Sequence, residues 1–224
     1  MNRIAVNFQN IRNRVDQIAA VCRREAAEIT LLAVSKTRPV SDIEALYAYG
    51  VRQFGENREP ELTAKAAALP GDIIWHFIGP LQSNKVRKVV KVASMIHSVE
   101  SIALLERVER ISGEENRQPQ FLLEVNVSGE LSKGGFAPEQ LDEAVKIAVN
   151  CKNAKFSGFM TMAPLGAEKD ELLKIFSTLR EIRDHYAAAY NIALPVLSMG
   201  MSGDFPEAIE CGATIVRIGT AIFA

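Results

Sequence analysis

The sequence predicts an α/β protein built as a single (β/α)8 barrel with an extra helix at its N-terminus. Eight short apolar runs alternate with segments of helical periodicity along the 224 residues. Runs of this kind, rich in β-branched or large apolar residues and bounded by Gly, Pro, Asn or Ser, are typical of buried parallel strands. A count of eight favours a closed barrel. An open doubly wound sheet is the alternative, and the lack of a strong G-x-G-x-x-G turn after the first run argues against it.

The elements follow in order along the chain. An opening helix is predicted because five residues recur at helical spacing on one face, namely Phe8, Ile11, Val15, Ile18 and Cys22. The eight apolar runs are then expected to form strands at 31–34, 51–54, 73–78, 95–99, 121–127, 156–160, 196–199 and 214–218.

Two helix starts carry a capping-box pattern. Ser41 with Glu44 and Asp204 with Glu207 have the spacing in which the first side chain caps the helix that follows. Pro206 would lie in the first turn of the second helix, where a missing N–H is harmless. The basic stretch at 84–91 is interpreted as the solvated face of one helix.

Composition indicates an ordinary globular protein without a global charge bias. Apolar residues make up 48%, charged residues 24%, and the net charge is −1, so nothing points to nucleic acid or to an acidic membrane surface. Three cysteines without C-x-x-C spacing indicate free thiols in a reducing compartment. With no signal-peptide pattern and no long apolar run, we expect a cytoplasmic protein that does not contact a membrane, with residues 1–224 forming one domain.

The chemistry is expected at the C-terminal ends of the strands, where barrel active sites lie. The first predicted strand ends in Lys36, after a Leu-Leu-Ala-Val-Ser run. A lysine at the inner rim is costly unless it is paired or has a lowered pKa, and a desolvated lysine amine is the usual nucleophile for a Schiff base. A lysine that simply extends to the surface at a strand end is the alternative interpretation.

Two Gly-rich strand ends favour the first interpretation. SMGMSGD at 198–204 and RIGT at 217–220 follow the last two predicted strands, where barrels often build a phosphate site. Backbone N–H groups there, with the hydroxyls of Ser202 and Thr220, could cradle a dianion. Ordinary turn chemistry would give the same residues, so each loop alone is weak evidence.

A Schiff-base lysine that faces a phosphate cradle fits pyridoxal 5′-phosphate (PLP), and it also fits a Schiff-base aldolase that acts on a sugar phosphate. Arg217 helps to separate the two possibilities. If its side chain points inward from the last strand, it could hydrogen-bond the pyridine nitrogen of PLP. An ion pair near the barrel rim is the alternative role for Arg217.

Five segments stand out along the chain, namely AVSKT at 33–37, FGEN at 54–57, WHFIGPLQSNK at 75–85, SMGMSGDFPEAIECG at 198–212 and VRIGTAIF at 216–223. These segments together resemble the PLP homeostasis protein family (YggS/PROSC), which itself resembles the barrel domain of alanine racemase. They occur in order across nearly the whole chain.

The resemblance implies PLP on Lys36 and Arg217 at the pyridine nitrogen. It further implies that Asn57 lies near the ring and that the phosphate is held by Ser202, Gly219 and Thr220 together with backbone around Met199 and Gly200. Family members are regarded as carriers or regulators of PLP in vitamin B6 homeostasis. PLP-dependent apo-enzymes would then be possible recipients of the cofactor.

Two departures from the family pattern stand out. Arg58, Glu59 and Pro60 follow FGEN where many relatives carry a Tyr-Val-Gln-like stretch, which is expected to alter the helix start more than the chemistry. The sequence also ends at Ala224, where the family usually continues past a glycine. On that ground we expect a less well closed phosphate cradle.

The remaining polar candidates receive smaller roles. His76 and Gln82 flank the third strand end, and for His76 one structural hydrogen bond is favoured over acid–base work. We expect His97 at most at the rim and His185 on the surface of a long helix. Asn126, Ser128 and Lys133 could line the mouth, although a polar loop is the simpler account. No set of His, Cys and carboxylate residues has metal-ligand spacing, so no metal is predicted.

A carrier is favoured over a racemase-like enzyme that would use the same lysine. A racemase needs a second acid–base group on the opposite face of the cofactor. We expect no second domain to supply it, and all four tyrosines are predicted in helices, at Tyr47, Tyr49, Tyr186 and Tyr190. We therefore expect no catalytic residues and a monomer that holds PLP.

Overall fold

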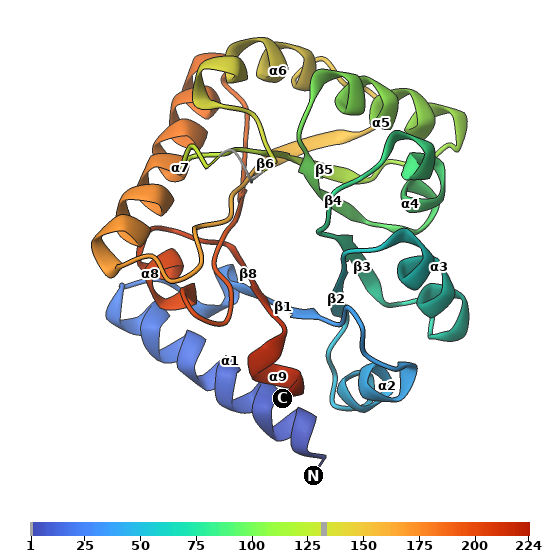
Figure 1. Ribbon diagram of the computed structural model, residues 1–224, viewed down its shortest axis with the longest axis vertical. Helices are drawn as coiled ribbons and strands as arrows, with labels where there is room; N and C mark the ends of the chain where they lie inside the picture. Colours follow the sequence, from blue (N-terminus) through green and yellow to red (C-terminus); the bar gives the residue numbers. More distant parts are fainter. Residues whose placement is uncertain (1, 131–133) are drawn as a thin grey trace.

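The computed structural model describes residues 2–130 and 134–224, and in this part of the chain it contains a closed barrel of eight parallel strands (Figure 1). Each strand pairs with the next along the chain, and the last pairs with the first. The strands are β1 (Thr30–Val34), β2 (Gln53–Glu56), β3 (Ile74–Phe77), β4 (Met95–Val99), β5 (Gln120–Glu124), β6 (Lys155–Met160), β7 (Val196–Ser198) and β8 (Ile215–Ile218). The predicted (β/α)8 barrel is therefore confirmed.

The helices form an outer ring around the strands, as Figure 1 shows. The α-helices are α1 (Arg3–Val21), α2 (Val40–Ala48), α3 (Glu59–Ala68), α4 (Val86–Val92), α5 (Ile102–Glu114), α6 (Leu141–Ala148), α7 (Lys169–Tyr190), α8 (Phe205–Glu210) and α9 (Thr220–Phe223). Short 3₁₀ turns occur at η1 (Ala26–Glu28), η2 (Ser83–Lys85) and η3 (Pro138–Gln140). Helix α1 precedes the first strand and is the predicted additional helix.

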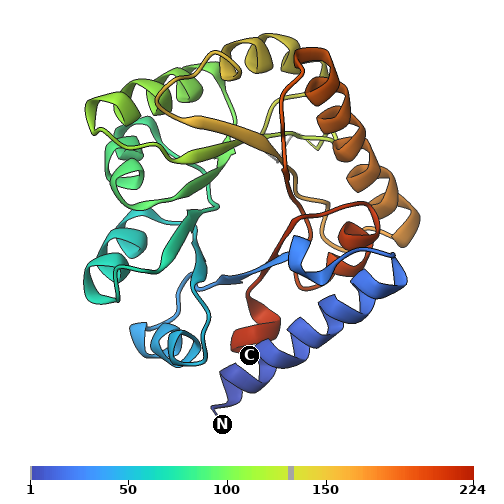
Figure 2. The ribbon, with the colours of Figure 1, turned by 180° about the vertical axis from the view of Figure 1, so that it is seen from behind.

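Helix α1 lies beside the last two helices of the chain. Figure 2 shows it running along the outside of the barrel next to α8 and α9. Asn7 donates its side-chain N–H to the carbonyl of Ile222 at 3.1 Å, which attaches the C-terminal helix to α1. Arg14 lies over the ring of Phe205 at the start of α8. Both ends of the chain are thus held together on one side of the barrel.

The boundaries of two strands differ from the prediction for local reasons. Strand β2 begins two residues later than expected, because the N–H of Val51 donates to the carbonyl of Leu46 and so closes α2. Strand β5 ends at Glu124, and Val125 forms an isolated bridge to Phe136.

The two predicted capping boxes are both wrong in detail. Helix α2 begins at Val40 directly after Pro39, so Ser41 lies inside the first turn and caps nothing. Proline at that position already sets the backbone for the helix start. Asp204 does precede α8, but its carboxylate accepts from the N–H of Met201 at 2.5 Å instead of from the helix. It therefore closes the loop after β7.

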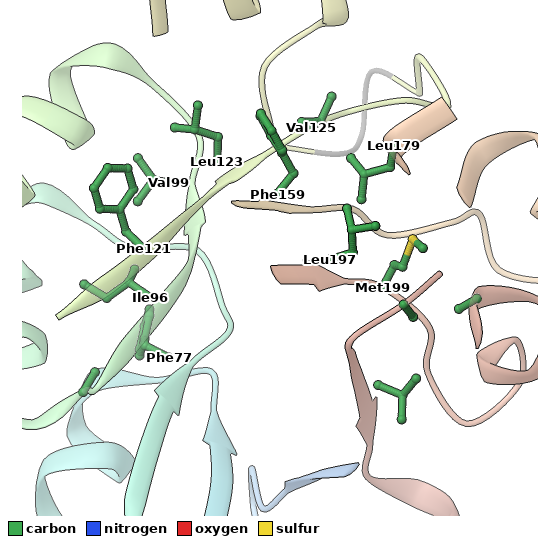
Figure 3. Close-up of a cluster of buried hydrophobic side chains, with 14 of the residues drawn as sticks. Phe77, Ile96, Val99, Phe121, Leu123, Val125, Phe159, Leu179, Leu197 and Met199 are labelled. Carbon is green, nitrogen blue, oxygen red and sulfur yellow. The ribbon is translucent and has the colours of Figure 1, made fainter. Parts of the chain in front are cut away.

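The main apolar core lies between the strands and the helices. Side chains that point outward from neighbouring strands pack there, among them Phe121, Leu123, Phe159 and Leu197 (Figure 3). The basic stretch at 84–91 fits this arrangement, since Val86, Val89 and Val90 of this segment are buried in the core while its charged residues remain outside. No helix in the described ranges is both long enough and apolar enough to span a bilayer.

Candidate functional site

The inside of the barrel has an apolar cluster with polar side chains next to it. The apolar residues are Leu32, Met95, Leu122, Met160, Val196 and Ile215. Side chains alternate between the two faces of a strand, so the inward positions two residues after Leu122, Val196 and Ile215 are Glu124, Ser198 and Arg217. All three are buried. The C-terminal half of the barrel interior is thus polar, as an active site requires.

Lys36 is the second residue after β1, at the C-terminal mouth. Its side chain is exposed and has no hydrogen bond or ion pair within the described ranges. The expectation that Lys36 is desolvated is therefore wrong for this structure, because the residue lies beyond the end of β1, where solvent reaches the mouth. The next residue, Thr37, has φ of 61°, which is unusual for a β-branched residue. Such backbone strain is concentrated at functional sites.

A buried ionic cluster holds this strand end. The Lys65 ammonium donates to the Ser35 carbonyl and to Glu56 Oε1, both at 2.8 Å, and to Glu61 Oε2 at 3.2 Å. Glu61 Oε2 also accepts the N–H of Thr37 at 2.8 Å. The residues on both sides of the exposed lysine are therefore tied to one ammonium group. Sequence reasoning missed this cluster, because its members are spread over a strand, a turn and a helix.

Burial and pairing act in opposite directions on the carboxylates of that cluster. Desolvation raises the pKa of Glu56, and the hydrogen bonds from Lys65 and Ser35 oppose this change. For Glu61, desolvation is outweighed by the Thr37 N–H and the Lys65 ammonium, so the pKa is lowered. The cluster is accordingly fixed by hydrogen bonds as well as by charge.

Arg217 points into the barrel, the direction that a contact with the pyridine nitrogen would need, and is 5% exposed. Its guanidinium donates to Ser198 Oγ at 2.7 Å and to the Thr161 carbonyl at 2.9 Å. Burial lowers the pKa of Arg217 to about 10, against the opposing charges of Glu124 and Asp204, so the group stays charged at neutral pH. No carboxylate lies within ion-pair distance of it in the described part of the chain. Arg217 is a buried cation that has only neutral hydrogen-bond partners.

The two buried histidines lie inside the barrel below Arg217. His76 Nδ1 and His97 Nε2 are 2.9 Å apart, and His97 Nδ1 is 2.8 Å from Ser198 Oγ. The expectation of a rim position for His97 is wrong, because its ring is fully buried between β3 and β7. His76 makes two hydrogen bonds, the second to Gln53, and His185 is exposed on α7 as expected.

Glu124 is a functional candidate that the sequence argument did not identify. It is 5% exposed, and its carboxylate has no hydrogen bond to another described residue, although its backbone carbonyl accepts from the N–H of Phe136. Desolvation, and then the charge of Glu100, raise the pKa of Glu124 to about 7, while Arg217 opposes the change. The signal was present in the sequence, since Glu124 lies within the apolar run FLLEV, two residues after Leu122, and so its side chain falls on the same face of the strand as Leu122.

The raised pKa of Glu124 gives a testable pH dependence of stability. Between pH 4.5 and 7 the folded protein holds a proton that the unfolded chain releases, so ionising Glu124 destabilises the fold as pH rises. A shift from 4.5 to about 7 corresponds to at most about 3 kcal/mol. We therefore expect Glu124→Gln to stabilise the PLP-free protein at pH 8 and to have little effect at pH 5, as measured by urea unfolding. The exposed Glu139→Gln is the control, and an equal gain at both pH values would contradict the assignment.

The loops after β7 and β8 lie together at the mouth. The N–H of Ala221 donates to Ser202 Oγ at 3.4 Å, which links the two loops. Gly200 has φ of 90°, and a Cβ there would lie 2.6 Å from the Cβ of Ala208, so only glycine fits. In the described ranges the N–H groups of Ser202, Gly219 and Thr220 have no acceptor. These unpaired donors could bind an anion.

Met199 and Asn57, two further predicted residues, differ in whether they have a polar group free to bind a ligand. Met199 donates its N–H to the carbonyl of Ile215 at 3.1 Å, and its side chain packs in the outer core (Figure 3). It has no free N–H for a phosphate and serves to hold the strand end. Asn57 follows β2, and its Oδ1 is buried without a hydrogen-bond partner in the described structure. A buried amide oxygen of this kind needs a donor.

The loop after β5 explains two of the remaining candidates. Asn126 Oδ1 accepts from Ser128 Oγ at 3.2 Å and from the N–H of Gly129 at 3.1 Å, so these residues shape a polar turn. Lys133 lies outside the described residues. Among the described residues, no group of three or more His, Cys, Asp or Glu side chains could hold a metal ion.

Comparison with known proteins places the chain in a family. The model of the alanine racemase N-terminal domain matches residues 6–224. A protein of Synechocystis named pyridoxal phosphate homeostasis protein is 42% identical over 197 residues, which is 87% of this chain and 90% of the relative. The protein of the same name from Pseudomonas aeruginosa is 38% identical and covers 100% of this chain and 96% of its own length. The chain belongs to the pyridoxal phosphate homeostasis protein family.

Solved structures agree with this assignment. PipY of Synechococcus elongatus is 38% identical and superimposes with a TM-score of 0.86 without PLP and 0.83 with PLP bound, covering 94% of this chain and 99% of PipY in each case. Alanine racemase from Streptomyces coelicolor has a TM-score of 0.76 at 18% identity, and this chain covers 57% of it. The likeness to the racemase therefore extends to the barrel fold alone.

Proposed function

We propose that this protein binds PLP as a Schiff base on Lys36, in a single barrel domain spanning residues 1–224, and that it holds or delivers the cofactor in PLP homeostasis without catalysing a reaction. The names of the relatives and the PLP-bound PipY structure support the choice of cofactor. Arg217 carries the proposal, because a buried guanidinium without a carboxylate partner is stabilised by a hydrogen-bond acceptor, such as the pyridine nitrogen of PLP.

The residues at the mouth fit the three functional groups of PLP. Lys36 is an accessible amine at the end of β1, and its condensation with the cofactor aldehyde forms a C=N bond with loss of one water. Arg217 offers N–H donors to the pyridine nitrogen. The buried Oδ1 of Asn57 lacks a donor that the ring hydroxyl could supply.

The phosphate group would bind between the last two loops. The free N–H groups of Ser202, Gly219 and Thr220 lie there, and Gly200 allows the first loop to approach α8 closely. The Thr220 side chain is exposed and the Ser202 side chain is half-buried, so both hydroxyls can reach a ligand at the surface. Met199 would contribute only by holding the end of β7 in place.

Reductive trapping tests this proposal directly. We expect the purified protein to be yellow and to carry about one PLP per chain. Borohydride reduces the C=N bond to a stable amine, and peptide mass mapping should then find the pyridoxyl group on Lys36. A label that lies mainly on another lysine would overturn the assignment of the site.

A racemase-like enzyme remains the second candidate, because Glu124 provides an acid–base group that the sequence argument had not found. Its buried carboxyl has a pKa raised to about 7 at the barrel mouth, which suits proton transfer near neutral pH. Against this function, Tyr47, Tyr186 and Tyr190 lie in α2 and α7 and Tyr49 directly follows α2, so none projects from a strand end.

A panel of amino acids monitored by chiral chromatography distinguishes carrier from enzyme. We expect negligible racemase, decarboxylase or transaminase turnover from the PLP-loaded protein. Turnover near an ordinary rate of roughly 10 per second, lost in both Lys36→Ala and Glu124→Gln, would establish the enzyme instead. Transfer of PLP to a PLP-dependent apo-enzyme, followed by the activity that appears, tests delivery by the protein, which we expect to act as a monomer.

A further inference from the structure

A continuous row of hydrogen bonds crosses the barrel interior and ends on Arg217. It starts at Gln53 Oε1, which is 3.1 Å from His76 Nε2. His76 Nδ1 is 2.9 Å from His97 Nε2, and His97 Nδ1 is 2.8 Å from Ser198 Oγ. Arg217 Nη1 donates to the same Ser198 Oγ at 2.7 Å. The row therefore runs from the N-terminal end of β2 to the cofactor side of β8.

The two ends of the row determine the proton positions along it. At one end Gln53 Oε1 can only accept, so a neutral His76 carries its proton on Nε2, and its Nδ1 accepts from His97 Nε2. His97 Nδ1 then has no proton and accepts from the Ser198 hydroxyl. At the other end Arg217 can only donate, so Ser198 Oγ accepts from it. All hydrogen bonds in the row thus point away from Arg217, and both rings are neutral.

The surroundings of the histidines keep them neutral. His76 is 2% exposed and His97 is fully buried. Desolvation lowers the pKa of His76 to about 4, and desolvation, His76 and the Arg217 charge lower the pKa of His97 well below its usual value. No carboxylate of a described residue hydrogen-bonds either ring. The positive charge of Arg217 is consequently not neutralised by a hydrogen-bond partner, since both partners, Ser198 Oγ and the Thr161 carbonyl, are uncharged.

We infer that Ser198, His97 and His76 are positioning residues, which hold the Arg217 guanidinium in one orientation by a proton-ordered hydrogen-bond chain. This inference rests on the proposed function, in which the pyridine nitrogen of PLP is the acceptor for Arg217. Two contacts, to Ser198 Oγ and to the Thr161 carbonyl, fix the guanidinium plane and leave its other N–H groups for the ligand. Because Ser198 must use its own proton on His97, the hydroxyl stays turned so that it accepts from Arg217.

The proton positions can be tested on the unmodified protein by ¹⁵N NMR of the histidine rings. The chain has three histidines, and the exposed His185 provides an internal reference that a His185→Gln variant assigns. We expect His76 and His97 both as neutral rings protonated on Nε2, with and without PLP, between pH 6 and 8. A doubly protonated ring, or His97 protonated on Nδ1, would overturn the chain.

A pair of matched serine variants tests whether the chain positions Arg217. Ser198→Ala removes the hydroxyl between Arg217 and His97, while Ser157→Ala removes an equally buried hydroxyl that donates to Gln120 on a neighbouring strand. We expect Ser198→Ala to bind PLP about tenfold more weakly and to change the ring signals of His97, whereas Ser157→Ala should change neither. Equal PLP affinity in both variants would overturn the positioning role.

The two proposals fail in different experiments. A borohydride label on a lysine other than Lys36 would overturn the proposed attachment, but it would leave the histidine signals as predicted. Conversely, a wrong tautomer at His97 would overturn the positioning chain while Lys36 remained the labelled residue. The NMR measurement needs no PLP, so it tests the proton positions of the hydrogen-bond chain even in a protein that has lost the cofactor.

Discussion

Lys36→Ala is expected to weaken PLP binding by at least roughly 100-fold, which corresponds to about 3 kcal/mol of binding free energy. The variant keeps the phosphate loops and Arg217 but loses the amine that forms the covalent bond. Because the Lys36 side chain is exposed and unpaired in the described structure, its removal should leave the free energy of unfolding nearly unchanged. Equilibrium dialysis of PLP, combined with urea unfolding, measures both quantities.

Two control variants separate the loss of the covalent bond from the loss of charge. Lys36→Arg keeps the positive charge but cannot condense with an aldehyde, so we expect it to resemble Lys36→Ala in affinity. Lys146→Ala removes an exposed lysine on α6, outside the strand ends that form the mouth, and should bind PLP normally. If the affinity of Lys36→Ala matched that of the unmodified protein, attachment at this residue would be refuted.

Arg217→Glu is expected to bind PLP more weakly and to gain slow half-transamination. Arginine can only donate, so it leaves the pyridine nitrogen unprotonated and the ring a poor electron sink. A glutamate at that position would favour a protonated ring, which supports carbanion chemistry. The amino acid would then be converted to its keto acid while PLP becomes pyridoxamine phosphate. The measurement is the amount of pyridoxamine phosphate formed over hours in the variant and in the parent.

The buried site imposes a structural cost on that substitution. The introduced carboxylate would replace a cation near the raised-pKa carboxyl of Glu124, and Ser198 and the Thr161 carbonyl would lose their donor. We therefore expect a destabilisation of roughly 3–5 kcal/mol. Arg217→Gln, which is neutral and can still donate, serves as the second variant and should bind PLP weakly without transaminating. Equal conversion in parent and Arg217→Glu would show that Arg217 does not keep the cofactor inert.

The sequence was sufficient for the barrel because its signals are local. Runs such as 95–99 and 156–160 contain the apolar residues that parallel strands require, and the structure places β4 and β6 there within one residue. Boundaries failed where a local hydrogen bond that the apolar pattern does not show decides them. Val51 has strand character, yet its N–H is used to close α2, so β2 starts at Gln53.

Candidate residues next to strand ends could be found in the same way. Lys36 and Arg217 follow from the position of each strand end together with the alternation of side chains, whereas Asn57 was expected only from the resemblance to the PLP homeostasis protein family. Whether such a residue is buried does not follow, because burial depends on the direction the chain takes afterwards. Lys36 was expected to be desolvated and is exposed, since it lies beyond the end of β1, where solvent reaches the mouth.

The sequence by itself determined the barrel, the two Gly-rich loops and the lysine and arginine that would bind PLP, because each is encoded in a short segment. Only the tertiary structure decided that His97 is buried, since its partners His76 and Ser198 are 21 and 101 residues away along the chain. The same holds for the pKa of Glu124, which depends on desolvation by the closed barrel and on the charges of Glu100 and Arg217. Burial and electrostatic coupling arise from contacts between distant segments, and a pattern read along one segment does not contain them.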